Sequence, residues 1–160
     1  MSKNIIAENR NPLESEGGNI LINLIYISRV SNNISSETLN KILNEARINN
    51  QRHGVSGVLL FNANYFLQII EGARPVINQL LTNLINDDRH QEIEVVHCGE
   101  INKREWGDWS MAYASPSKSN LPIFLKYSVS AEFNPYMMST ESIYRLLATI
   151  SSKPIPSEES

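Results

Sequence analysis

The segment YFLQIIEG at residues 65–72 decides how the rest of the chain is interpreted. Side chains alternate between the two faces of a strand, so Phe66, Gln68 and Ile70 share one face. Gln68 therefore places an uncharged amide in the middle of an apolar face. A buried amide without hydrogen-bond partners costs about 1–3 kcal/mol. We expect either an ordinary protein group or the polar edge of a ligand to meet it.

The segments around this strand form a regular order of strands and helices. Apolar runs predict strands over residues 20–28, 55–61, 65–72, 92–101 and 109–113, with an Asn-rich turn at 62–64. The first strand is apolar on both faces, which indicates a central strand covered on both sides. The order strand, helix, strand, strand, helix, strand, strand predicts an α+β fold, a ferredoxin-like βαββαββ sheet with two helices on one face.

Two helices are predicted within this order. The first follows a cap at Ser35 or Ser36 and should fade near Asn49 and Asn50. The second begins at Pro75. Its buried stripe should comprise Ile77, Leu80, Leu81, Leu84 and Ile85.

The remainder of the chain is predicted to cover the other face of the sheet with two further helices. One begins at Pro122, and the other follows a cap at Ser139 or Thr140. We therefore expect a flexible N-terminal tail at 1–19, a domain at 20–114, a two-helix extension at 115–151 and a disordered tail at 152–160.

Composition excludes several classes of function. The net charge of −3 and the scattered Lys and Arg residues favour neither nucleic acid nor a membrane surface as a partner. No apolar run approaches the roughly 20 residues of a membrane-spanning helix. Cys98 is the single cysteine, so we expect a small core residue and a cytoplasmic protein without an intrachain disulfide. His53, His90 and His97 lack the spacing of metal ligands, so no metal site is expected.

The chemically informative residues gather on the central strands. Tyr26 and Gln68 should both face the helices, near the helix end that carries Asn49 and Asn50. A phenol and amides make an uncharged hydrogen-bonding patch, without the paired carboxylates, thiolate or Ser-His-Asp set that acid–base or nucleophilic catalysis needs. Such a patch suits the polar edge of a flat heteroaromatic ring held between aliphatic side chains.

Six short motifs then occur in order across about 95 residues. They are LIYIS at 24–28, NN at 49–50, GVSGVLLF at 54–61, FLQIIEG at 66–72, DDRH at 87–90 and WSM at 109–111. Each motif alone is weak, but together the chain from about residue 21 to 114 resembles a BLUF domain, the blue-light-sensing flavin module, in its short single-domain form.

The resemblance implies roles for individual residues. Tyr26 and Gln68 would lie beside a non-covalently bound flavin, FAD or else FMN, and Asn50 would hold the ring edge with Asn49 flanking it. Trp109 and Met111 would lie near the ring. Arg89 would contact the flavin phosphate, with His90 close by. Taken singly, each of these residues can also be interpreted without a ligand, as a side chain that fills the core or as a residue at the end of a helix.

The implied function is that of a photoreceptor rather than an enzyme. Light would drive an electron and a proton from Tyr26, and the hydrogen bonds of Gln68 would rearrange. Since no output domain is evident after the module, we expect the C-terminal helices to signal to a downstream protein or within a homo-oligomer. Two alternatives remain, a flavin-dependent reductase and a flavin-free interaction module on the same fold. Nicotinamide turnover would favour the first, and a colourless protein the second.

Overall fold

A computed structural model of the chain describes residues 16–31, 34–107, 112–114, 121–129 and 132–151. The expected tails at 1–19 and 152–160 lie almost entirely outside these residues. Trp109 and Met111 also lie outside them. Within the described part of the chain, no helix is long and apolar enough to cross a membrane.

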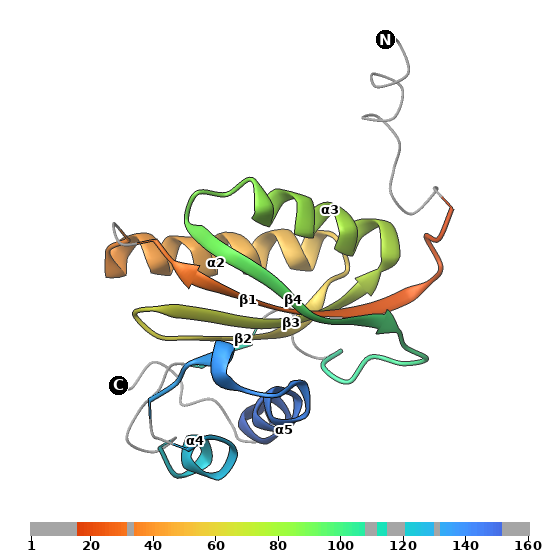
Figure 1. Ribbon diagram of the computed structural model, residues 1–160. Helices are drawn as coiled ribbons and strands as arrows, with labels where there is room; N and C mark the ends of the chain where they lie inside the picture. The colour runs from red at the N-terminus through yellow and green to blue at the C-terminus, as the bar shows by residue number, and fades with distance from the viewer. Residues whose placement is uncertain (1–15, 32–33, 108–111, 115–120, 130–131, 152–160) are drawn as a thin grey trace.

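One five-stranded sheet organises the fold (Figure 1). Its strands are β1 (Leu21–Val30), β2 (Ser56–Phe61), β3 (Tyr65–Ala73), β4 (His90–Glu100) and β5 (Ala112–Ala114). Their order is β4-β1-β3-β2-β5, with β5 parallel to β2 and all other neighbours antiparallel. This arrangement confirms the ferredoxin-like fold, with β1 and β3 lying side by side inside the sheet.

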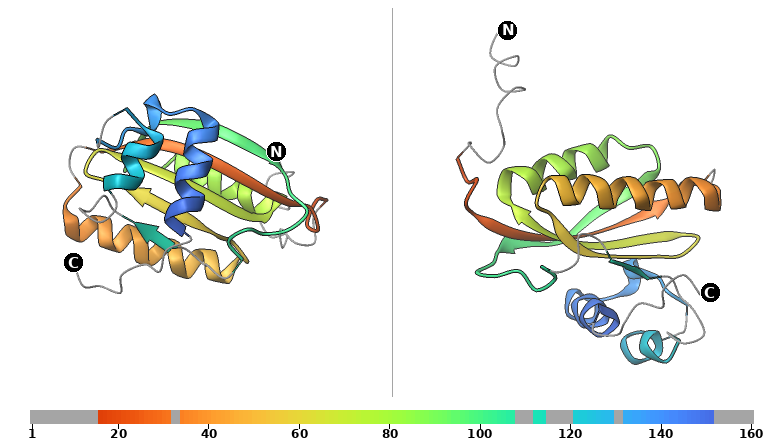
Figure 2. Two further views of the ribbon diagram at one scale, coloured as in Figure 1. Left: turned by 90° about the horizontal axis from the view of Figure 1, so that it is seen from below. Right: turned by 180° about the vertical axis from the view of Figure 1, so that it is seen from behind.

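Helices cover both faces of the sheet, as the sequence predicted. The helices α2 (Ser36–Arg52) and α3 (Arg74–Ile85) lie on one face. On the other face lie α4 (Leu121–Tyr127), the short 3₁₀ helix η2 (Pro135–Met137) and α5 (Thr140–Ser151), with α5 crossing the strands (Figure 2). Below, the α2–α3 side is called the upper face and the α5 side the lower face.

The ends of α2 are set by local sequence. Ser35 is the N-cap, and its hydroxyl accepts a hydrogen bond from the backbone N–H of Thr38. At the other end Gly54 has a φ of +66°, and the backbone N–H of Val55 bonds to the carbonyl of Asn50 at 2.8 Å. This 6→1 bond across a left-handed glycine is a Schellman ending. It extends the helix past the expected limit and fixes Asn50 in its last turn.

The alternation of side chains divides the apolar residues into two cores. On β1, Leu24 and Tyr26 belong to the upper core, whereas Ile25 and Ile27 belong to the lower core. The lower core also contains four residues of α5, namely Ile143, Leu146, Leu147 and Ile150. The expected double coverage of the first strand is therefore confirmed.

A close backbone approach holds the hairpin of β2 and β3 in register. A Cβ atom at Gly57 would lie 2.0 Å from the carbonyl oxygen of Ile69, which no L-residue tolerates. Glycine at this position therefore permits the pairing that places Gln68 opposite Leu59.

Two burial predictions are wrong. Ile85 is 62% exposed, because it is the last residue of α3 and the buried part of the stripe stops before it. Cys98 is also exposed. It belongs to β4, an edge strand whose pairing with β1 shifts register twice, so its side chains are only partly covered.

Candidate functional site

Tyr26 and Gln68 meet across neighbouring strands. The antiparallel register of β1 and β3 places them directly opposite each other, and both side chains belong to the upper face. Tyr26 is 1% exposed and Gln68 is 7% exposed. The Tyr26 hydroxyl donates a hydrogen bond to the side-chain oxygen Oε1 of Gln68. The structure thus brings together the two residues on which the sequence interpretation most depends.

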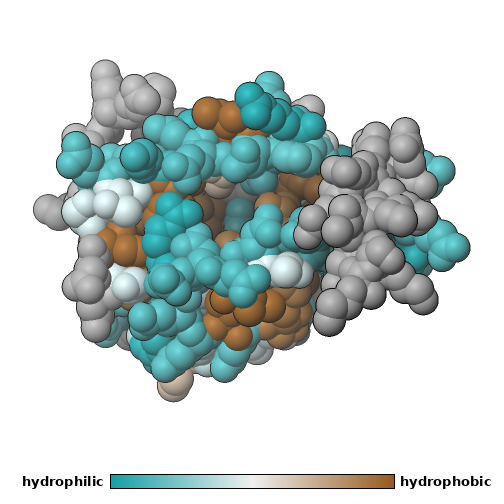
Figure 3. Space-filling model, turned by 90° about the horizontal axis from the view of Figure 1, so that it is seen from above, coloured by the Kyte–Doolittle hydropathy of each residue, from teal (hydrophilic) through white to brown (hydrophobic). Residues whose placement is uncertain are grey.

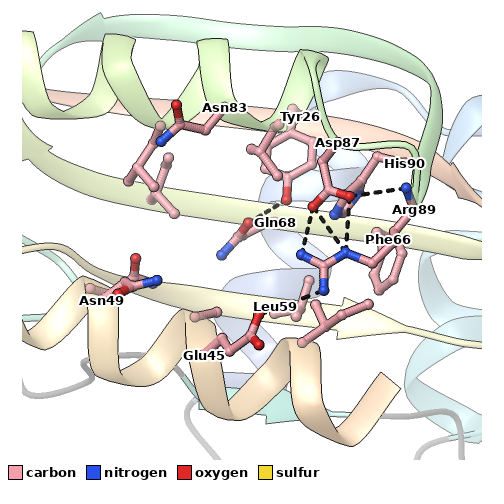
Figure 4. A pocket seen from close by; sticks show the side chains of 16 residues that line it. Tyr26, Glu45, Asn49, Leu59, Phe66, Gln68, Asn83, Asp87, Arg89 and His90 are labelled. Atoms are coloured by element: carbon pink, nitrogen blue, oxygen red, sulfur yellow. Dashed lines mark hydrogen bonds and ion pairs between the residues drawn. The ribbon is translucent and has the colours of Figure 1, made fainter. Parts of the chain in front are cut away.

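A pocket opens above this pair, between the sheet and the helices α2 and α3. Seen from the helix side, the molecule shows a hollow with apolar walls between two polar ridges (Figure 3). Aliphatic side chains from both helices and the sheet line it, namely Ile42, Leu59, Ile70, Leu80 and Leu84. Gln68 points into the pocket, with Asn49 on α2 and Asn83 on α3 to either side (Figure 4).

The last turn of α2 supplies two neighbouring amides to the pocket. Asn50 is buried, at 4% exposure, whereas Asn49 is exposed, and both line the cavity. Amide groups offer both donors and acceptors. Amides beneath aliphatic walls fit a flat heteroaromatic ring with a polar edge, so the residues present suit a flavin.

The floor of the pocket is electrically neutral. Burial raises the pKa of the Tyr26 phenol well above its usual range, and the charge of Asp87 raises it further. The phenol therefore stays protonated and remains a donor to Gln68 at every ordinary pH. The site can hold and orient a neutral ring edge, and its Tyr26 hydroxyl donates a hydrogen bond to the Gln68 amide.

His90 forms part of the pocket wall next to this pair. It is 9% exposed, and its Nδ1 lies 2.8 Å from the hydroxyl oxygen of Ser28. Its ring packs on Phe66 with 4.6 Å between centroids, and it meets Tyr26 edge-on at 6.2 Å. Burial lowers the pKa of His90 to about 4, so the imidazole is neutral at pH 7. His90, which the sequence places close to the flavin phosphate, therefore carries no positive charge at pH 7.

Arg89 lies at the edge of the pocket between two carboxylates. Its Nε and Nη2 donate to Asp87 at 2.9 and 2.7 Å, and its Nη1 lies 3.6 Å from Glu45 of α2 (Figure 4). Hydrogen bonding to Arg89 lowers the pKa of Asp87 and raises that of Arg89. Arg89 thus lines the pocket and links α2 to the turn after α3, while its contact with a flavin phosphate stays a prediction.

Trp109 and Met111 cannot be placed, because they lie outside the described residues. Met111 immediately precedes β5, which pairs with β2 so that Tyr113 lies opposite Leu59. Leu59 lines the pocket, so the chain reaches the neighbourhood of the site directly after Met111.

Sequence reasoning missed several residues around the site. Ser28 lies two positions after Tyr26 on the same strand face, a signal that was available, but its partner His90 is 62 residues away. Asp87 was noted only as part of the DDRH motif, and Glu45 was not singled out. Among the described residues, no cluster of His, Cys, Asp or Glu could hold a metal ion.

The fold and the pocket define an α+β domain with a cavity between its sheet and two helices, and the uncharged amides and aliphatic side chains of this cavity suit the polar edge of a flat ring. The chain belongs to the BLUF family, the sensors of blue light using FAD, whose model matches residues 21–112. FAD is therefore the cofactor with which members of this family sense blue light, and the pocket is suited to its ring.

Individual relatives and structures agree with this assignment. The chain is 32% identical over 90 residues to the photoactivated adenylate cyclase subunit beta of Euglena gracilis, covering 55% of this chain but 10% of that protein. It is 27% identical over 92 residues to the blue light- and temperature-regulated antirepressor BluF of Escherichia coli, covering 58% of this chain and 23% of that protein. The chain therefore spans a tenth to a quarter of these two curated relatives.

Two solved structures extend the similarity beyond the family match. BlsA in its photo-activated state superposes with a TM-score of 0.77 at 26% identity, covering 86% of this chain and 99% of BlsA. The dark-state structure of the BLUF protein BlrB gives a TM-score of 0.69 at 32% identity, covering 83% of this chain and 96% of BlrB.

Proposed function

We propose that this protein is a blue-light photoreceptor in which Tyr26 is the electron and proton donor and Gln68 is the switch. The hydrogen bond from the Tyr26 hydroxyl to Gln68 Oε1, buried beneath a pocket that suits a flavin, carries the proposal. Asn50, with Asn49 beside it, would hold the ring edge, while Arg89 and His90 would lie toward the phosphate.

The chemistry divides between cofactor and protein. When bound, the flavin would supply blue-light absorption and an acceptor for an electron and a proton. Tyr26 would give up an electron and then its hydroxyl proton to that acceptor, and it would recover both when the cycle closes. While its proton is absent, the Tyr26 oxygen can no longer donate to Gln68 Oε1. The Gln68 amide would then rearrange by rotation or tautomerisation, because its carbonyl has lost the hydrogen bond from Tyr26.

The proposed function is sensing rather than turnover. The pocket presents a neutral phenol, amides and a neutral imidazole, and its carboxylates Glu45 and Asp87 interact with Arg89. The signal would pass through Trp109, Met111 and the helices α4 and α5 to a downstream protein or to a second copy of the chain. The net charge of −3 favours a protein partner over nucleic acid or an anionic membrane.

An absorption spectrum before and after blue light tests the proposal. Protein reconstituted with FAD should be yellow, release flavin on denaturation, and show a modest red shift that reverses in the dark. Failure to bind FAD supplied in excess, or a bound flavin with no reversible shift, would refute it. Sustained consumption of a reduced nicotinamide would support a reductase instead.

A further inference from the structure

Glu71 lies on the same strand as Gln68 but faces the opposite side of the sheet. They are three positions apart, about 10 Å along β3, and an odd separation directs side chains to opposite faces. Gln68 points up into the pocket, whereas Glu71 points toward the lower layer and is 1% exposed. The strand therefore carries a pocket residue on one face and a buried carboxylate on the other.

The Glu71 carboxylate binds two consecutive backbone groups of the connection between β4 and β5. Its Oε1 accepts from the N–H of Glu105 at 2.8 Å, and its Oε2 accepts from the N–H of Trp106 at 3.1 Å. The hydroxyl of Ser56 donates to the same Oε2 at 3.2 Å. A carboxylate is retained in such a buried position only when donors compensate for lost water. Here two of the donors are backbone N–H groups of the β4–β5 connection, so these hydrogen bonds hold that connection against β3.

Arg104 reinforces this attachment from the other side. Its guanidinium donates to the Ser56 hydroxyl at 2.8 Å, to the Glu71 backbone carbonyl at 3.1 Å and to the Gly54 carbonyl at 2.5 Å. Ser56 thus accepts from Arg104 and donates to Glu71, and such a chain of hydrogen bonds is mutually strengthening. The segment 104–106 is held to β2 and β3 by both side-chain and backbone contacts.

The same segment contacts α5 at two places. Trp106 is buried in the lower core, and its Nε1–H donates to the Ser151 hydroxyl at 2.7 Å. The Trp106 ring meets Tyr144 edge-on at 6.1 Å, and the Tyr144 hydroxyl donates to the Glu105 carboxylate. Tyr144 lies in the second turn of α5 and Ser151 is its last residue. Segment 104–106 therefore joins β3 to most of the length of α5.

We propose that Glu71 is a positioning residue that couples β3 to α5 through the segment 104–106. The light dependence of this coupling rests on the proposed function, because the rearrangement of Gln68 would be the event that displaces β3. One carboxylate holds two successive N–H groups, so a displacement of β3 moves the segment as a unit. Trp106 then transmits that displacement to α5, because close-packed side chains move together rather than deform. This route from β3 to α5 passes through residues 104–106 and does not require Trp109 or Met111.

A measurement in the dark tests the attachment without any photochemistry. In Glu71→Gln, an amide NH₂ replaces one of the two acceptor oxygens. Hydrogen exchange at the N–H groups of Glu105 and Trp106 should become at least tenfold faster. The matched control is Glu100→Gln, the same substitution at an exposed site on β4. Unchanged protection of both N–H groups in Glu71→Gln would overturn the proposal.

A second measurement under blue light tests the coupling. Glu71→Gln should retain the red shift and bind FAD within twofold of the parent, yet lose at least half of the light-induced exchange change in α5. A purely structural role would lower protection equally in dark and light. A full light response of α5 in this variant would overturn the proposal.

A gentler variant covers the case in which Glu71→Gln does not fold. Ser56→Ala removes the hydroxyl between Arg104 and the carboxylate but leaves both N–H bonds to Glu71. It should reduce the α5 light response at least twofold, and an unreduced response would overturn the proposal. If the parent itself shows no red shift, the proposed function fails, whereas the dark measurement still decides the role of Glu71.

Discussion

The Nδ1 atom of His90 and the hydroxyl oxygen of Ser28 lie 2.8 Å apart, on two neighbouring strands and among apolar side chains. Burial lowers the pKa of His90 to about 4 from an ordinary value of 6.5; the charge of Asp87 opposes this change, and that of Arg89 assists it. The folded protein therefore holds this imidazole in its neutral form over a range in which the unfolded chain would protonate it.

This relationship predicts a pH dependence of stability. Between pH 6.5 and 4 the unfolded chain binds more protons at His90 than the folded chain does. The contribution of His90 to the free energy of unfolding is thus complete above pH 6.5 and falls as the pH drops toward 4, by up to roughly 3 kcal/mol. Urea unfolding at several pH values measures this change in the free energy of unfolding.

Two variants test the assignment to His90. His90→Gln should flatten the dependence of the unfolding free energy on pH between 6.5 and 4, whereas His97→Gln, at an exposed site on the same strand, should not. An unaltered slope in His90→Gln would contradict the assignment.

The photochemical role of Tyr26 predicts a separation of binding from response. Tyr26→Phe keeps the ring that packs in the upper core but removes the hydroxyl, so flavin should still bind and the red-shifted state should not form. Light-minus-dark absorption spectra measure this. Gln68→Ala should abolish the shift as well. A normal difference spectrum in Tyr26→Phe would show that the donor lies elsewhere, and one in Gln68→Ala would remove that amide from the mechanism.

The two asparagines at the end of α2 predict unequal effects on affinity. Asn50 is buried, so its replacement by alanine should remove a ring-edge hydrogen bond worth about 0.5–1.5 kcal/mol, or about two- to tenfold in the dissociation constant of FAD. Asn49→Ala, one position earlier and exposed, should have a smaller effect. Titration of the flavin-free protein compares the two. Equal affinities for parent and Asn50→Ala would exclude the ring-edge contact.

The position of Arg89 predicts a dependence on the phosphate of the ligand. If Arg89 contacts phosphate, Arg89→Gln should weaken binding of FAD and FMN severalfold but leave riboflavin, which has no phosphate, unchanged. Parallel titrations with the three flavins measure this. An equal loss for all three would instead mean that Arg89 acts by linking Glu45 to Asp87 across the pocket edge.

The path to the C-terminal helices predicts a selective effect at Met111. Met111→Ala should leave the red shift largely intact, because Tyr26 and Gln68 remain in place. It should reduce the light-induced changes in residues 121–150, since the variant loses the flexible side chain that we propose responds to the Gln68 amide. Hydrogen exchange in dark and light measures both. Equal light-induced changes in variant and parent would rule out this route.

The sequence by itself determined the order of the elements, the ferredoxin-like sheet and the face of each strand that is buried. Alternation along one strand and helical spacing are local properties, so they could be read without knowing any partner. Together with the predicted sheet topology, they placed Tyr26 and Gln68 on the helix face. They also assigned Ile143, Leu146, Leu147 and Ile150 to the buried side of the last helix, and the structure confirms both. The six motifs named the family that the family model also finds.

Only the tertiary structure decided which groups meet across the fold. The register of β1 and β3 sets Tyr26 opposite Gln68, and the two shifts in the pairing of β4 are compatible with the contact between His90 and Ser28. In the sequence Glu71 was only a residue near the end of a predicted strand, yet its carboxylate accepts hydrogen bonds from N–H groups 34 and 35 positions away. Contacts of this kind depend on strand pairing and layer packing between distant segments, which no periodicity along one segment encodes.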